Sequence, residues 1–110
     1  MSSKKEIRKN FKESVFKRDG YSCVWCQEKY VKETVDEFLD AHHITDRNEM
    51  PNGGYVKENG ISLCKEDCHM KAEKFHITEG KEWSIGMHPD DLYIIIGSSK
   101  EEAIKASEKL

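Results

Sequence analysis

The sequence predicts a small α+β protein that folds as one domain over residues 1–110. Segments with helical spacing of apolar residues alternate with short strand-like segments, and 110 residues suit a single domain. Charged residues make up 35% of the chain and hydrophobic residues 36%, so apolar burial alone would give a thin core. Four cysteines in two close pairs could form a cross-link that holds such a core together.

Basic residues are concentrated at the start of the chain. The whole protein has a net charge of -3, but residues 1–18 hold seven basic and two acidic side chains, a net +5. The remainder therefore carries -8, and such an asymmetric protein can present one basic face. The pattern permits a nucleic-acid partner, and a solvated helix face explains it equally well.

The first half of the chain predicts one helix and two strands. Ile7, Phe11 and Val15 recur at i, i+4 and i+8, which predicts an amphipathic helix over residues 4–18. Residues 38–44 and the segment ISLC read as strands. Between them, Gly, Pro and Asn residues indicate an exposed loop.

The second half predicts two helices and a strand. A helix begins at Cys68, and it places His69, Glu73 and His76 on one face at i, i+4 and i+7. The segment DLYIIIGSS predicts a strand, and Ser98-Ser99 predict the start of a last helix. Residues 77–110 would form a C-terminal strand-helix extension.

The cysteines predict a structural metal site. Cys23 and Cys26 are separated by two residues, and Cys64 and Cys68 by three. Two such pairs can close a tetrahedral Zn²⁺ shell, and closed shells of this kind are structural. Disulfides or four unrelated thiols are the alternatives. No apolar run approaches the roughly 20 residues of a membrane span, so we expect a cytoplasmic protein, whose reducing surroundings favour metal over disulfides.

Adjacent histidines end the first predicted strand. Neighbouring side chains on a strand point to opposite faces, so His42 and His43 would face different surroundings. Asn59 directly precedes the second strand region, and His69 directly follows Cys68. We expect these three segments to converge on one spot.

The order CVWC, AHHI, NGISLC, CH resembles the zinc-containing HNH endonucleases, over about residues 18–76. The resemblance implies a ββα-metal core, also called the His-metal finger, preceded here by a basic helix. It implies a metal-dependent endonuclease that cuts DNA, an activity that a plasmid-nicking assay would detect most directly. Small phage-encoded members are similar in size, so we expect a bacterial or phage-infected host.

The same resemblance implies roles for individual residues. His43 matches the general base that deprotonates the attacking water, and its neutral imidazole suits that task. His42 and His69 match ligands of a catalytic divalent cation, Mg²⁺, Mn²⁺, Ni²⁺ or Zn²⁺. Asn59 matches the middle asparagine, which either orients the base loop or approaches the metal. Which of these applies stays open from the sequence.

Several further residues have alternative interpretations. Glu73 and His76 could be metal ligands, supporting groups or surface residues. The proposed nucleic-acid contacts, each of which could equally be solvated, are Lys5, Lys9, Lys12, Arg18 and Arg47.

The resemblance implies DNA as the partner, with double-stranded DNA favoured, and neither a membrane nor a small-molecule cofactor is expected. The rival interpretation is a non-catalytic zinc-stapled module that binds nucleic acid or protein through its basic helix. It explains the cysteines but not the order and spacing of the histidines and Asn59. RNA as the main substrate would use the same site.

Overall fold

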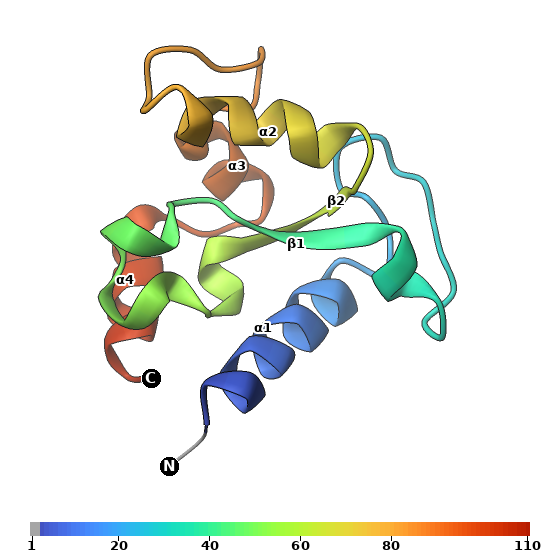
Figure 1. Ribbon diagram of the computed structural model, residues 1–110, viewed down its shortest axis with the longest axis horizontal. Coiled ribbons are helices and arrows are strands. Elements are labelled where there is room, and N and C mark those ends of the chain that lie inside the picture. The colour runs from blue at the N-terminus through green and yellow to red at the C-terminus, as the bar shows by residue number, and fades with distance from the viewer. Residues whose placement is uncertain (1–2) are drawn as a thin grey trace.

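A computed structural model describes residues 3–110 as a two-stranded sheet with helices on both faces. The strands β1 (Leu39–His43) and β2 (Gly60–Cys64) pair antiparallel, with His42 opposite Ile61 and His43 opposite Gly60. The helix α1 (Lys4–Arg18) runs along one side of the sheet and α2 (Cys68–Ile77) crosses the other (Figure 1). Strands β1 and β2 with α2 form the predicted ββα core.

Helix α1 forms where the apolar spacing predicts it. The Ser3 side chain caps the helix by accepting a hydrogen bond from the Glu6 backbone N–H at 3.2 Å. Phe11, Val15 and Phe16 are buried against the sheet. Gly60 permits this close contact, because a Cβ there would lie 2.5 Å from a methyl group of Val15. The basic residues of α1 consequently stay on its outer surface.

A loop of short 3₁₀ turns connects the two strands. The turns span Arg47–Glu49, Pro51–Gly54 and Lys57–Asn59, and another, Val35–Glu37, precedes β1. Asn52 and Gly53 adopt left-handed backbone conformations with φ of 52° and 82°. This is the Gly, Pro and Asn chemistry that the sequence indicates for a loop. The loop ends at Asn59, whose side chain is fully buried.

The predicted C-terminal strand is wrong, because this segment forms α3 (Pro89–Ile95). Pro89 occupies the first helical turn, and the His88 ring caps the helix by accepting from the Asp90 backbone N–H at 3.1 Å. Leu92 and Tyr93 are buried while Ile94 is 76% exposed, a one-sided pattern that suits a helix. The extension is therefore two helices rather than a strand and a helix.

The last helix, α4 (Lys100–Glu108), begins as predicted with Ser99 as its cap. The Ser99 side chain accepts a hydrogen bond from the Glu102 backbone N–H at 3.1 Å. Ala103 of α4 joins a hydrophobic core that continues through Leu92 to the sheet. None of the helices within residues 3–110 combines the length and apolar character needed to cross a membrane.

Candidate active site

The four cysteines converge at one end of the sheet. Cys23 and Cys26 lie in the turn after α1, Cys64 ends β2 and Cys68 begins α2. Their sulfur atoms all lie within 4.8 Å of one another, and all four thiols are free. A tetrahedral cation bound at about 2.3 Å from each sulfur implies sulfur–sulfur separations of about 3.8 Å. This four-cysteine cluster therefore has the spacing of a metal site.

The chemistry of these thiols also fits a cation. The backbone N–H groups of Cys26 and Cys68 donate to the sulfurs of Cys23 and Cys64, at 3.5 and 3.3 Å. Burial raises the pKa of the Cys23 thiol, but backbone hydrogen bonds outweigh it and the pKa is lowered overall. Burial and the neighbouring sulfurs raise the pKa of Cys68. A cation at the centre of the cluster would stabilise all four sulfurs as thiolates.

A second group of possible metal ligands lies between β1 and α2. It contains His42 from the strand with His69 and Glu73 from successive turns of the helix, with ligand atoms within 4.8 Å of one another. One Glu73 oxygen lies 3.2 Å from His42 Nδ1 and 3.0 Å from His69 Nε2. The Nδ1 atom of His42 is buried and forms no hydrogen bond of good geometry. A buried ring nitrogen without a hydrogen-bond partner, beside a carboxylate oxygen, suits a cation shared by the two groups.

The two histidines of this cluster have pKa values shifted in opposite directions, with that of His42 lowered and that of His69 raised. Burial lowers the pKa of His42, so its ring is neutral, as a metal ligand must be. Burial also opposes charge on His69, but hydrogen bonds with Asp40 and Glu73 outweigh it and raise its pKa to about 9. Without a metal, His69 and the two carboxylates form an ion-paired triad. With a metal, His69 Nε2 would lose its proton to become a ligand.

Asp40 supports the metal interpretation. Its carboxylate lies 2.7 Å from His69 Nδ1, the ring nitrogen that faces away from the cluster. Histidines that bind metals commonly donate their second ring N–H to a carboxylate, which fixes the ring orientation. Asp40 stands two residues before His42 on the same face of β1, so strand periodicity was a signal that could have identified it.

His43 faces the opposite side of the strand from His42, as alternation predicts. Its ring lies 4.7 Å from the rings of both Phe11 and Tyr55, measured between centroids. Its Nε2 atom is buried and has no hydrogen-bond partner. Burial and the neighbouring His42 lower the pKa of His43 to about 4, so the ring is neutral at pH 7. A neutral imidazole with a free ring nitrogen is able to accept a proton.

Asn59 is occupied entirely by the loop that follows His43. Its side-chain oxygen accepts from the Thr45 backbone N–H at 2.9 Å and from the Tyr93 hydroxyl at 2.7 Å. Its amide nitrogen donates to the carbonyls of Thr45 and Gly54, at 3.0 and 3.2 Å. Of the two roles left open by the sequence, these contacts favour orientation of the base loop.

Comparison with known proteins adds one finding. Residues 23–75 match the family model of the HNH endonuclease. Residues 23–75 therefore form an HNH endonuclease domain. The match begins at the first cysteine and includes both strands, the connecting loop and most of α2, so the HNH domain contains both candidate metal sites. Neither the curated proteins nor the solved structures give a significant match.

Two further histidines have structural contacts around the HNH domain. His76 Nε2 lies 2.9 Å from the backbone carbonyl of His43, and so His76 holds the end of β1 rather than joining the metal cluster. His88 caps α3. Trp25, in the cysteine turn, packs beside Gly86 and is 39% exposed.

The predicted nucleic-acid contacts divide into two groups around the HNH domain. Lys5, Lys9 and Lys12 lie exposed on α1, and Arg47 lies exposed in the loop after β1. The Arg18 guanidinium instead donates to the carbonyls of Lys57 and Gly60, at 2.6 and 2.7 Å. Arg18 also pairs with Asp19 at 2.8 Å, so its donors are used to fasten α1 to the sheet.

Proposed function

We propose that the protein is a metal-dependent endonuclease that hydrolyses DNA phosphodiester bonds, with His43 as general base. One observation carries the proposal. Two adjacent residues of β1 face opposite sides of the sheet. On one side His43 has a neutral imidazole with a nitrogen that forms no hydrogen bond. On the other side His42 lies with His69 and Glu73 in a set of possible metal ligands. A proton acceptor and a cation site are thereby held a fixed distance apart by one rigid strand. HNH family members act on DNA, which supplies the substrate class.

The four-cysteine cluster would hold a structural Zn²⁺. Thiolates are the ligands that Zn²⁺ prefers in closed tetrahedral sites, and such sites leave no position for substrate. A cation here joins the turn after α1 to the beginning of α2, which carries His69. Its contribution is to the fold of the active site and not to the chemical step.

The second cluster would hold the catalytic cation through His42, His69 and Glu73. A divalent cation with open positions stabilises negative charge that develops on a phosphate and its leaving oxygen. Two imidazole nitrogens and one carboxylate oxygen suit Zn²⁺, Ni²⁺ or Mn²⁺ better than Mg²⁺, which prefers oxygen ligands. Asp40, through its contact with His69 Nδ1, would fix the orientation of the ring and leave Nε2 available as the ligand.

His43 would perform the proton transfer. Its imidazole ring would accept a proton from water as the water oxygen bonds to phosphorus and the bond to the 3′-oxygen breaks, and the departing 3′-oxygen would take up a proton from solvent. The products expected from the family resemblance are 5′-phosphate and 3′-hydroxyl ends. Asn59 contributes by fixing the loop at Thr45, immediately after the strand that carries His43. The exposed lysines of α1 would make phosphate contacts that do not depend on base sequence.

Plasmid nicking tests this function. Purified protein is incubated with supercoiled DNA and, in separate reactions, Mn²⁺, Ni²⁺, Zn²⁺ or Mg²⁺, and cleavage is followed as conversion to open-circle and linear forms. We expect cleavage that saturates with cation concentration and stops with chelator. A folded protein that binds the plasmid but leaves it intact with all four cations would instead support the non-catalytic module, in which Glu73 only pairs with two histidines. Single- and double-stranded RNA tested in parallel separates RNA from DNA as the substrate.

A further inference from the structure

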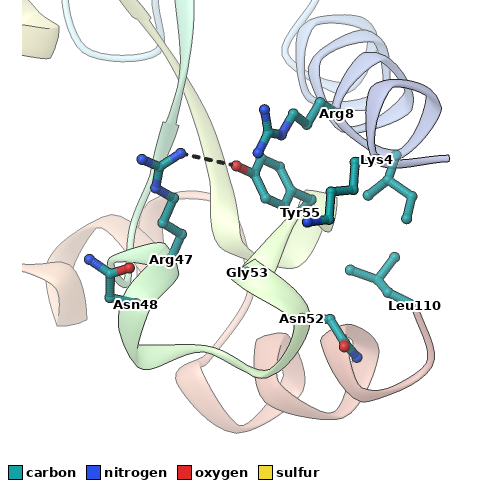
Figure 2. A pocket seen from close by; sticks show the side chains of 9 residues that line it. Lys4, Arg8, Arg47, Asn48, Asn52, Gly53, Tyr55 and Leu110 are labelled. Atoms are coloured by element: carbon teal, nitrogen blue, oxygen red, sulfur yellow. Dashed lines mark hydrogen bonds between the residues drawn. The ribbon is translucent and has the colours of Figure 1, made fainter.

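A surface cavity lies on the His43 side of the sheet and is not part of either metal cluster. It has a volume of about 520 Å³, within the range of roughly 300–1,000 Å³ typical of ligand pockets. It is bordered by the first turns of α1, by the loop after β1 and by the end of the chain (Figure 2). All of these lining residues lie outside the metal clusters and outside β1 and β2.

The cavity is lined by cations that lack acidic partners. Lys4 and Arg8 come from α1 and Arg47 from the loop, and no acidic side chain contributes to the lining described by residues 3–110. Among the described residues, neither Arg8 nor Arg47 forms a salt bridge. By contrast, Lys9 and Lys12 of α1 pair with Glu13 and Asp36. Uncompensated guanidinium groups beside a cavity favour an anionic ligand.

Tyr55 holds the two arginines in place. The Arg8 guanidinium lies over its ring, with Cζ 5.4 Å from the centroid, and Arg47 Nη1 donates to its hydroxyl at 3.4 Å. Both side chains point toward Tyr55 from opposite elements, as Figure 2 shows. Tyr55 also contacts the proposed base, because the centroids of the Tyr55 and His43 rings are 4.7 Å apart.

We infer that this cavity is a subsite for a backbone phosphate of bound nucleic acid, held by Arg8 and Arg47 on the His43 side of the sheet. Guanidinium groups bind phosphate oxygens through paired hydrogen bonds, and two of them organised on one tyrosine ring form a preorganised clamp. This inference rests on the proposed nucleic-acid substrate. It adds a path for the substrate: the bound nucleic-acid strand would pass from the active site along the first turns of α1.

The test is the salt dependence of binding to a 20-base-pair duplex, measured by fluorescence anisotropy without added divalent cation so that no cleavage occurs. The variants are Arg8→Gln, Arg47→Gln and both together. Each lost phosphate contact lowers the slope of log affinity against log salt by about 0.9 on duplex DNA. The double variant removes the single proposed phosphate contact and should therefore lose about 0.9 from the slope. Because both arginines are exposed, unfolding temperature should not change.

Lys81→Gln is the matched control, because it removes one positive charge from an exposed residue in the loop after α2. That loop lies across the sheet from α1 (Figure 1). Its slope should equal that of the wild type. A double arginine variant that keeps the wild-type slope, or a wild type that binds no duplex, overturns the subsite. So does an effect equalled by Lys81→Gln, which would indicate net charge alone.

Two further measurements distinguish failure of the proposed phosphate subsite from failure of the proposed endonuclease function. Inorganic phosphate is titrated into the wild type and the double variant, and binding to the wild type with no change in duplex slope would show a site for free anions and overturn the inference. If the slope falls as expected but the wild type never cuts DNA, the subsite stands and the proposed endonuclease function fails.

Discussion

The Tyr93 hydroxyl donates a hydrogen bond of 2.7 Å to the side-chain oxygen of Asn59, which joins α3 to the loop behind the proposed base. The same hydroxyl lies 2.6 Å from the Thr45 side-chain oxygen, and all three residues are buried. Tyr93 lies outside the family match, yet it completes the hydrogen bonding of the asparagine within it. The C-terminal helices thus help to position the active-site loop.

Replacing Tyr93 with Phe should remove this support while leaving the core filled. The side-chain oxygens of Asn59 and Thr45 each lose a partner in a buried setting, which typically costs about 1–3 kcal/mol. We expect a lower unfolding temperature and, at temperatures where the variant is folded, a lower kcat with little change in DNA affinity. Tyr30→Phe is the control, because no hydrogen bond to the Tyr30 hydroxyl is present among the described residues. Equal kcat for both variants would show that Tyr93 acts only on stability.

Loss of the thiolate-bound metal should unfold the protein. The cluster links the turn after α1 to α2 across a core made thin by the high charge content, so metal binding and folding are coupled. A thiol-reactive mercurial should release about one Zn²⁺ per chain from the wild type, since four thiolates close one shell. Cys64→Ser should lose both this metal and the cooperative unfolding transition. A metal-free protein that unfolds at the wild-type temperature would contradict the structural role.

Asp40→Asn tests whether His69 is a metal ligand. The amide cannot hold the His69 ring in the same protonation state, and comparable changes behind metal-binding histidines reduce metal affinity by about 10- to 100-fold. We expect cleavage to require correspondingly more Mn²⁺, with near-normal rates at saturation. Lys65, the exposed partner of Asp40 at 4.0 Å, provides Lys65→Gln as a control for the surface ion pair. An unchanged metal requirement, with only stability altered, would favour the ion-paired triad.

The elements of the HNH core were predictable because their signals are local. Apolar spacing determines α1, and strand alternation places His42 and His43 on opposite faces. The sequence of α3 predicts a strand because three consecutive isoleucines have high strand propensity. The His88 cap and Pro89 in the first turn decide the segment, together with burial of only one of its sides. The cap, the proline and the one-sided burial together override intrinsic strand preference.

Residues that meet only through packing gave no usable sequence signal. Glu73 differs from these, because helical spacing already places it on the His69 face, and the structure brings it to both histidines. Arg8 and Tyr55 are 47 positions apart and meet because α1 lies against the loop. Nothing in the local sequence around Tyr55 or Tyr93 indicates a role beside the active site.

The most direct test of the account is the rate of DNA cleavage by His43→Ala at saturating Mn²⁺. The substitution removes the proposed proton acceptor but leaves the four-cysteine cluster, the His42, His69, Glu73 cluster and the basic residues in place. We expect normal folding, metal content and DNA affinity, with cleavage slower by about 100-fold or more, the usual contribution of a positioned base. His88→Asn, which keeps a capping side chain for α3, should cut at the wild-type rate. Cleavage by His43→Ala within a few-fold of the wild type, in a preparation free of contaminating nuclease, would contradict the mechanism.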